Sequence, residues 1–578
     1  MKIRFIGPLG KVTGSCTWMR DEAHGWNFLV DCGMQQGERT AAEWNACAWP
    51  FDPAEIKFVI LTHAHIDHCG LLPMLYKKGF KGLVYCSRET AEIAKILLRD
   101  AAELSDIGFT ARDVDAVRWH EPHQPPLFGR FHPVDRDLFV RFFRSGHIAG
   151  ALSVAVHWGA PGPGQRSIAF SGDLGPNSED REGLPFLRHR MYVGDNDYAV
   201  IESTYGATMR SSEQTDPEWR RAQLRYQLEQ TMARGGSLVI PAFAVGRVQD
   251  VLFDLHWIVA ENPARYANVG FYIDAPSAQK IGGVLLEAAR RTENNGRKGK
   301  VRPLWLGKQM FRWFDLDDTN PAHAEAALDI CRMTLTPKDR GEWRQAACGN
   351  AIARAWRPVF RTIRNRHQFM PDAATGASVF VISSGSCDGG PAAWWLPRLL
   401  GSANNTIAPA GYCSPGTVGG QLLALAQARP AERQRLTGNL RWSGGATMPL
   451  AQVGAEIVAL SGYSAHADQK GLLDWTFNVH EGRLRVAGEV VFIQHGEQLQ
   501  REGLAQAIMA KAQEAGTAAR TILPDDPDHW FDLDQNARVL ADEDCQRRLQ
   551  DEITRLTREL SRMQGISGKD IEGGDRRV

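Results

Sequence analysis

The chain has 578 residues, with 67 lysines and arginines balanced by 67 aspartates and glutamates, so its formal net charge is zero. This length exceeds what one hydrophobic core supports and predicts two or three domains, while the balanced charge gives no bulk sign of nucleic-acid binding. No apolar run approaches the ~20 residues that span a bilayer, and the 10 cysteines form no C-x-x-C pair. We therefore expect a cytoplasmic protein with reduced thiols and no membrane partner, and neither a disulfide framework nor a thiolate zinc site.

In the first 205 residues, short apolar runs of strand-forming side chains end in residues that can bind a metal ion or move a proton. Such strands deliver polar groups to one edge of a sheet, which is how layered α/β domains commonly place a site. The four clearest cases are residues 28–30 before Asp31, 58–61 before His63, 167–170 before Asp173 and 199–201 before Glu202.

From about residue 207 the pattern changes to strands alternating with helices, beginning with a helix expected over 213–234. This alternation predicts a parallel-sheet α/β domain. The earlier pattern returns twice. An apolar run at residues 456–460 precedes His466, and another at 490–493 precedes His495. We interpret the return as the chain re-entering the first domain, so that the second domain is an insertion with a cleft at the junction.

The tail has a third pattern, in which apolar side chains recur at spacings of four and three from about residue 533 onward. This pattern predicts an amphipathic C-terminal helix with coiled-coil character. A helix packed on its own domain and a homodimer contact fit the pattern equally well. The apolar positions are Cys545, Leu549, Ile553, Leu556, Leu560 and Met563.

The strongest chemical signal is the run His63-Ala64-His65-Ile66-Asp67-His68. His63 and His65 alternate as they leave a strand and can point to one metal, whereas Asp67 and His68 follow in the next turn and can serve a second. Neutral imidazole and carboxylate are ligands that divalent ions accept at neutral pH. The run therefore predicts the core of a two-metal hydrolytic site.

This run resembles the signature of the metallo-β-lactamase fold, and residues 14–16, 29–33, 145–147 and 171–173 are similar to the other motifs of that fold. Later segments resemble the β-CASP group of this fold, namely residues 202–206 as motif A, 464–468 as motif B and 495–497 as motif C. β-CASP proteins are nucleases. RNA-acting members such as RNase J typically carry histidine in motif C, where DNA-acting members usually carry valine, so His495 favours RNA.

The resemblance implies a complete set of metal ligands. The set is His63, His65 and His147 for one metal, Asp67, His68 and His495 for the other, and Asp173 as the bridge. We expect two Zn²⁺ ions, with Mn²⁺ as the alternative. Asp31 is expected to orient the ligating histidines by hydrogen bonding.

The resemblance also implies a mechanism, in which a hydroxide activated by the two metals attacks the phosphorus in line. His466 is the expected proton donor to the leaving oxygen, with Glu202 accepting a bond from its other ring nitrogen. Asp67 is counted with these two as a catalytic residue. The alternative for His466 is a buried structural histidine.

Contacts to the substrate phosphate are expected from the inserted domain and motif B, at Ser384, Gly385, Ser386, Ser464 and Arg247. Arg247 suits a structural ion pair across the domain junction equally well. One family arginine is missing, because the family's Gly-Thr-x-Gly-Arg pattern here ends in Gly420.

A basic segment between residues 338 and 366 interleaves arginines with Trp343 and Trp356. Basic and aromatic side chains together suit an RNA backbone with stacked bases. The alternative is a solvated helical face whose tryptophans pack on the domain.

The fold class implied by the resemblance is α/β: a four-layer αβ/βα metallo-β-lactamase sandwich with an inserted α/β β-CASP domain and a C-terminal helix. The expected boundaries are 1–207 for the first part of the sandwich, 208–452 for the insert, 453–520 for the second part of the sandwich and 521–578 for the helical tail. The expected function is a zinc-dependent ribonuclease that cleaves endonucleolytically; whether it also cleaves as a 5′-exonuclease is left open by the sequence. The alternatives are a DNA nuclease of the same family, a non-catalytic scaffold subunit of an RNA-processing complex and a small-molecule hydrolase.

Overall fold

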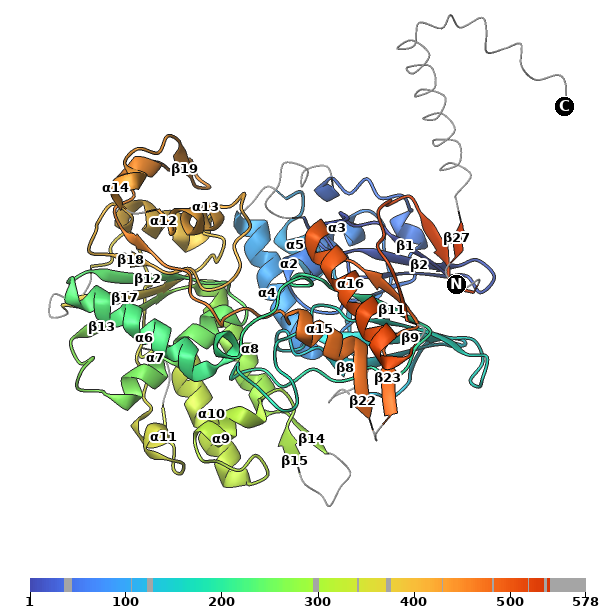
Figure 1. Ribbon diagram of the computed structural model, residues 1–578, viewed down its shortest axis with the longest axis horizontal. Coiled ribbons are helices and arrows are strands. Elements are labelled where there is room, and N and C mark those ends of the chain that lie inside the picture. The colour runs from blue at the N-terminus through green and yellow to red at the C-terminus, as the bar shows by residue number, and fades with distance from the viewer. Residues whose placement is uncertain are drawn as a thin grey trace, which may run out of the picture.

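The computed structural model has two lobes, one coloured blue and red and the other green to orange in Figure 1. It describes residues 1–35, 44–104, 107–121, 128–294, 301–339, 343–370, 376–428, 430–480, 483–517, 519–534 and 538–540. No helix among these residues is long and apolar enough to cross a bilayer.

Two mixed sheets face each other in the first lobe. The order of the first sheet is β27 (Arg538–Leu540), β26 (Trp530–Asp532), β1 (Lys2–Phe5), β2 (Thr17–Asp21), β3 (Trp26–Val30), β4 (Phe58–Ile60), β5 (Leu83–Tyr85) and β6 (Trp119–His120). The order of the second is β25 (Arg520–Ile522), β24 (Val490–Ile493), β11 (Tyr198–Ile201), β10 (Arg166–Phe170), β9 (Leu152–Trp158), β8 (Leu138–Arg144) and β7 (His132–Asp135). Apolar side chains from both sheets, among them Phe5, Phe28, Val156 and Phe492, form one core between them.

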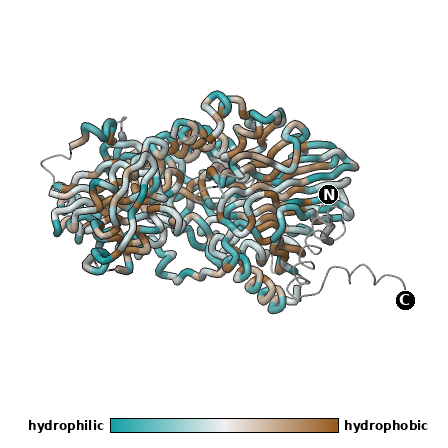
Figure 2. The backbone as a smooth tube through the Cα atoms, turned by 90° about the horizontal axis from the view of Figure 1, so that it is seen from above, coloured by the Kyte–Doolittle hydropathy of each residue, from teal (hydrophilic) through white to brown (hydrophobic). Residues whose placement is uncertain are grey.

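Helices cover the outer face of each sheet and complete a four-layer sandwich, as the sequence predicted. The helices on the first sheet are α2 (Ile66–Cys69), α3 (Leu72–Lys77), α4 (Arg88–Leu104) and α5 (Ala111–Asp115). The helices on the second sheet are α15 (Gln469–Thr476) and α16 (Gln498–Ala515). Figure 2 shows apolar segments running through the interior of both lobes.

The second lobe contains a parallel sheet of six strands, which confirms the predicted α/β insert. Its order is β16 (Arg361–Thr362), β13 (Val269–Asp274), β17 (Ala377–Ile382), β12 (Ser237–Pro241), β18 (Thr406–Ile407) and β21 (Glu456–Ile457). Successive residues of β12 face opposite sides, so Leu238 and Ile240 join one core and Val239 joins the other.

Helices pack on both faces of the insert's sheet. The helices of the insert are α6 (Pro217–Ala233), α7 (Arg247–Glu261), α8 (Pro276–Arg290), α9 (Lys308–Trp313), α10 (Pro321–Leu335), α11 (Ala351–Ala355), α12 (Gly390–Leu399), α13 (Val418–Leu425) and α14 (Pro430–Arg433). Of these, α6 and α7 pack on one face of the sheet, and α12 and α13 pack on the other. Local sequence explains where several begin. Asp216 caps α6 by accepting a hydrogen bond from the Glu218 amide, and Pro217 has no amide hydrogen to leave unpaired at the first position.

Three short hairpins and 3₁₀ turns complete the described chain. The hairpins pair β14 (Thr292–Asn294) with β15 (Val301–Pro303), β19 (Asn439–Arg441) with β20 (Thr447–Pro449), and β22 (Phe477–His480) with β23 (Arg483–Val486). The 3₁₀ turns are η1 (Pro53–Glu55), η2 (Glu213–Thr215) and η3 (Leu450–Gln452). The lobes meet where α4 packs against α8.

The structure corrects the predicted point of return to the sandwich at residue 453. Strand β21 pairs with β18 in the insert's sheet, and Leu460 bridges Ala410 beside it. The pattern of an apolar run before a polar turn is common to the strands of both lobes, so it could not distinguish them. The chain rejoins the sandwich only after this strand, and the boundary at 207 stays a prediction.

The tail also differs from expectation at its beginning. Strand β25 joins the second sheet, and β26 and β27 extend the first sheet beside β1, where a helical tail was expected from residue 521. The predicted amphipathic helix, from Cys545 to Met563, lies outside the described residues.

Candidate metal centre

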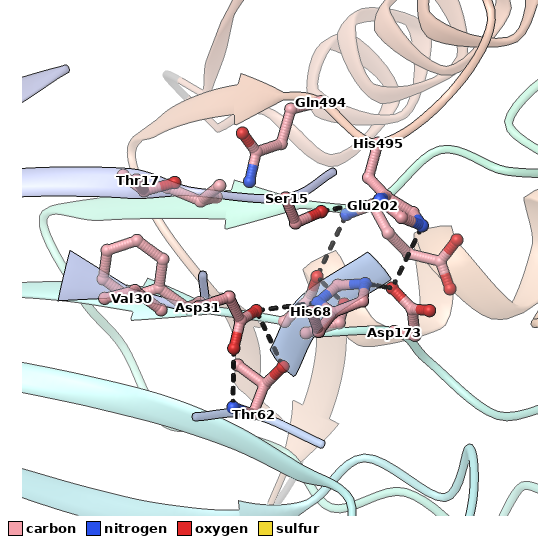
Figure 3. A pocket seen from close by; sticks show the side chains of 14 residues that line it. Ser15, Thr17, Val30, Asp31, Thr62, His68, Asp173, Glu202, Gln494 and His495 are labelled. Atoms are coloured by element: carbon pink, nitrogen blue, oxygen red, sulfur yellow. Dashed lines mark hydrogen bonds and ion pairs between the residues drawn. The ribbon is translucent and has the colours of Figure 1, made fainter. Parts of the chain in front are cut away.

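Strand ends of the sandwich bring four histidines to one carboxylate, that of Asp173, which follows β10. Asp173 Oδ2 is 3.3 Å from His63 Nε2 and 3.5 Å from His147 Nε2. Its Oδ1 is 3.3 Å from His68 Nε2 and 3.5 Å from His495 Nε2, and Figure 3 shows Asp173 beside these two rings. The two carboxylate oxygens thus face two different groups of histidines.

The predicted ligands fall into two clusters in which the potential ligand atoms all lie within 4.8 Å of one another. The first cluster is His63, His65, His147 and Asp173, and the second is Asp67, His68 and His495. In the first, His65 Nδ1 is 3.1 Å from His63 Nε2 and 3.0 Å from His147 Nε2. The structure therefore brings all seven predicted ligands together.

The hydrogen bonds around the clusters leave lone pairs pointing inward. His147 Nδ1 is 3.0 Å from the Ala465 carbonyl and His68 Nδ1 is 2.8 Å from Asp31 Oδ2, so each Nδ1–H donates outward and each Nε2 keeps its lone pair. Among the described residues, buried His68 Nε2 and Asp173 Oδ1 have no hydrogen-bond partner. Converging acceptors without a donor fit a divalent cation.

In the first cluster, burial also sets the histidine charges that ligation requires. Burial lowers the pKa of His63 to about 4 and that of His65 to about 3, and it holds the pKa of His147 well below its usual range. These three rings are neutral at physiological pH, which is the form that binds metals. Burial also lowers the pKa of His68, but the carboxylates of Asp173 and Asp31 outweigh it and raise that pKa well above its usual value.

Asp31 lies where the sequence predicted an orienting residue. Its carboxylate accepts from the Thr62 amide at 2.8 Å and the Thr62 hydroxyl at 2.9 Å, as well as from His68. Asp31 adopts a left-handed φ of 61° and His495 one of 51°, a conformation that few non-glycine residues hold.

His466 and Glu202 form the predicted pair beside the first cluster. His466 Nδ1 is 3.2 Å and 3.3 Å from the two oxygens of Glu202, and its ring centroid is 4.5 Å from that of His147. Glu202 is fixed in turn by the Leu174 amide at 2.7 Å and the Thr204 amide at 3.1 Å. This geometry leaves His466 Nε2 free to exchange a proton.

The predicted phosphate contacts are only partly gathered. Ser384 Oγ and Ser386 Oγ are 3.1 Å apart on one loop of the insert, and Ser464 Oγ accepts from the His466 amide at 3.3 Å. Arg247 is 4% exposed, pairs with Asp250 at 2.8 Å and donates to the Tyr463 carbonyl. Its ion pair lies within α7 and does not cross the junction.

Two residues near the site were not singled out from the sequence. Ser15 Oγ is 2.8 Å from His495 Nδ1, and the only signal was its place in the Gly14-Ser15-Cys16 motif. Arg210 donates to the His466 carbonyl at 2.8 Å and lies over the Tyr205 ring with its guanidinium carbon 4.4 Å from the centroid. A single arginine in a loop carries no pattern that could have identified it.

The structure contradicts the RNA-stacking interpretation of the two tryptophans in the basic segment. Trp356 is 0% exposed and packs against aromatic rings of α7 and against Phe314, and Trp343 packs partly buried against the same core. Neither is placed to stack a base, so packing on the domain is the correct alternative for them. Arg340 lies outside the described residues. The exposed cations are Lys338, Arg344, Arg354, Arg357, Arg361 and Arg364.

Comparisons with known families agree with this geometry. The model of the metallo-beta-lactamase superfamily matches residues 9–218, that of the Beta-Casp domain matches 248–422, and that of the Zn-dependent metallo-hydrolase RNA specificity domain matches 451–522. Membership of this superfamily implies divalent-metal binding, in accord with the two clusters.

Curated relatives extend the match over most of the chain. Ribonuclease TTHA0252 of Thermus thermophilus is 29% identical over 90% of this chain and 98% of its own length. Transcription termination factor FttA of Lokiarchaeum is 23% identical over 90% of this chain and 71% of its own, and FttA of Methanocaldococcus jannaschii is 24% identical over 86% and 67%. With the three domain models in order along it, the chain belongs to the β-CASP group of the metallo-beta-lactamase superfamily.

Proposed function

We propose that this protein is a metal-dependent ribonuclease that hydrolyses phosphodiester bonds in RNA. The observation that carries the proposal is the pair of clusters that share Asp173, with the Glu202–His466 pair beside them. The RNA specificity domain and the ribonuclease relative support RNA as the substrate.

We assign two Zn²⁺ ions to the clusters, because three imidazoles in one cluster and two imidazoles with a carboxylate in the other favour zinc over harder ions. His63, His65 and His147 would hold one ion, Asp67, His68 and His495 the other, and Asp173 both. When bound, such ions supply Lewis acidity toward a phosphate oxygen and toward the attacking water.

The chain's own groups position the substrate and handle the leaving group. Glu202 accepts the Nδ1–H of His466 and so directs Nε2 away from itself, where it gives a proton to the departing oxygen. Ser384, Ser386 and Ser464 offer hydroxyl groups to the phosphate. Arg247 brings a positive charge, and its buried Nη2 has no hydrogen-bond partner among the described residues.

The proposed mode of cleavage is endonucleolytic, with 5′-exonuclease activity as the second mode. A cytoplasmic location and a homodimer formed through the C-terminal helix stay predictions from the sequence.

The experiment that tests the proposal incubates the protein with RNA labelled at the 5′ or 3′ end, with and without a chelator. We expect internal cleavage that the chelator abolishes and Zn²⁺ restores. Matched DNA oligonucleotides are cut more slowly if RNA is the substrate, and faster cutting of DNA would overturn that assignment. Chelator-resistant cleavage would overturn the metal dependence.

A further inference from the structure

Two large aromatic side chains are exposed in neighbouring loops of the insert. Phe243 is 38% exposed in the loop between β12 and α7, and Tyr412 is 40% exposed in the loop after β18. The two residues lie close together, as the position of Gly411 shows. Gly411 directly precedes Tyr412, and a β-carbon placed on Gly411 would lie 3.5 Å from the Phe243 ring. We call Phe243 and Tyr412 the aromatic pair.

Glycine backbone holds the Phe243 ring in place. A β-carbon on Gly385 would lie 2.4, 2.6 and 2.7 Å from the adjacent ring atoms Cδ2, Cγ and Cε2. Such similar distances to three neighbouring atoms place Gly385 over one face of the ring, where no larger residue fits. Gly385 therefore covers one face of the ring, while 38% of the side chain stays exposed.

Tyr412 is fixed from the opposite lobe. Its hydroxyl donates to Glu497 Oε1 at 3.4 Å, and its ring lies edge-on to Tyr205 with centroids 6.4 Å apart at 83°. The Tyr205 ring is in turn 6.3 Å from that of His466. Tyr412 is thus two ring contacts from the proposed proton donor.

The loop between β12 and α7, which carries Phe243, lies near the metal clusters. A β-carbon on Gly246, three residues on, would lie 3.8 Å from Ile148, which follows the proposed ligand His147. The loop of Gly385 that covers the ring also carries Ser384 and Ser386. A strand held by those serines would pass its bases close to Phe243.

We propose that the aromatic pair stacks unpaired bases of the RNA next to the cleaved phosphate, with Phe243 as the main platform. This inference rests on the proposed ribonuclease function. Stacking on an aromatic face tolerates every base, because each has a π-face, but it requires a base that has left a duplex. The pair therefore selects single-stranded RNA without reading its sequence.

The first test measures stacking without cleavage. Short RNAs that each carry one 2-aminopurine are bound to the protein in excess chelator, and fluorescence quenching is recorded for each position. We expect strong quenching at one or two neighbouring positions. Phe243→Leu, which keeps apolar bulk against Gly385 but has no π-face, removes the quenching at one position, and Phe243→Trp retains it.

The second test uses RNAs that lack a single base. With the wild-type protein, loss of the base over Phe243 lowers kcat/KM about 10-fold, and Phe243→Leu on intact RNA lowers it by a similar factor. When Phe243→Leu acts on the abasic RNA, kcat/KM falls little further than with either change alone. Tyr226→Leu is the matched control, since Tyr226 is an exposed ring on α6 and outside these loops, and it leaves all values unchanged.

Quenching that persists in Phe243→Leu, or losses that simply multiply on the abasic RNA, would overturn the aromatic pair as a platform. A wild-type protein that quenches 2-aminopurine normally but cuts no RNA with metal restored would overturn the ribonuclease proposal alone. Thermal midpoints of the three variants that equal the wild-type value exclude a loss of folding as the cause.

Discussion

Buried histidines occur in both lobes, but their ring nitrogens are used differently. In the sandwich, His63 and His147 point Nε2 at other ring nitrogens and at Asp173. In the insert, His256 is equally buried, yet its Nδ1 donates to the Leu252 carbonyl at 2.6 Å and its Nε2 accepts from the Val359 amide at 3.3 Å. Burial alone therefore does not mark a ligand, whereas ring nitrogens that converge with a carboxylate on one point do.

Among the predicted effects on metal binding and RNA cleavage, replacement of Asp173 should have the largest, because both clusters share this residue. In Asp173→Asn an amide nitrogen replaces one oxygen and the central negative charge disappears. We expect RNA cleavage to fall below detection. Metal retention, measured by elemental analysis after dialysis, should fall by more than the ~10–100-fold affinity loss typical of groups that only orient ligands.

Asp137→Asn is the matched control, because Asp137 precedes β8 at the end opposite His147. It should keep full metal content and activity. Normal metal content in Asp173→Asn would contradict the assignment of Asp173 as a shared ligand.

His466→Ala is expected to have the next largest effect, and to separate proton transfer from metal binding. We expect kcat on RNA to fall by about 10²–10⁴-fold, the usual contribution of a general acid, with metal content unchanged. On a p-nitrophenyl phosphodiester the loss should nearly vanish, because that leaving oxygen needs no proton. Equal losses on both substrates would show that His466 does not act as the acid.

Ser15→Ala should have a smaller effect, through the orientation of His495. Ser15 Oγ accepts from His495 Nδ1–H at 2.8 Å and so keeps the Nε2 lone pair directed at the second cluster. We expect metal affinity to fall about 10-fold, at the low end for such orienting contacts. Competition with a chelator measures it, and an unchanged affinity would show that the ring is held by backbone alone.

The metal centre could be predicted because its residues occur in local patterns. His63 to His68 forms a dense run, and Asp31, Asp173 and Glu202 each directly follow an apolar strand of one of the two sandwich sheets. Those patterns are readable without knowing which strands are neighbours. The fold of the sandwich followed from the same motifs.

Other features depend on segments that meet only in the folded chain. Ser15 and His495 are 480 positions apart, and nothing near either residue indicates their contact. Strand β21 has two residues, and only its pairing with β18 assigns it to the insert. Trp356 lies in a basic segment, but its burial is decided by the rings of α7.

The smallest effect on activity is expected from His256, where the contrast with the ligand histidines can be tested by pH. Burial lowers the pKa of His256 to about 4, below the ~6.5 of an unfolded histidine. Between these values the unfolded chain binds the extra proton, so this contribution to stability is present above pH ~6.5 and is lost as the pH falls toward 4.

We therefore expect the thermal midpoint of the wild-type protein to fall more steeply from pH 7 to pH 4.5 than that of His256→Gln, with equal RNA cleavage by both at pH 7. Other acid-titrating groups occur in both proteins and cancel in the difference. Parallel midpoint curves would mean that His256 is protonated as easily in the folded chain as in the unfolded one. In that case burial would not keep the ring neutral, and the distinction between ligand and structural histidines would need another basis.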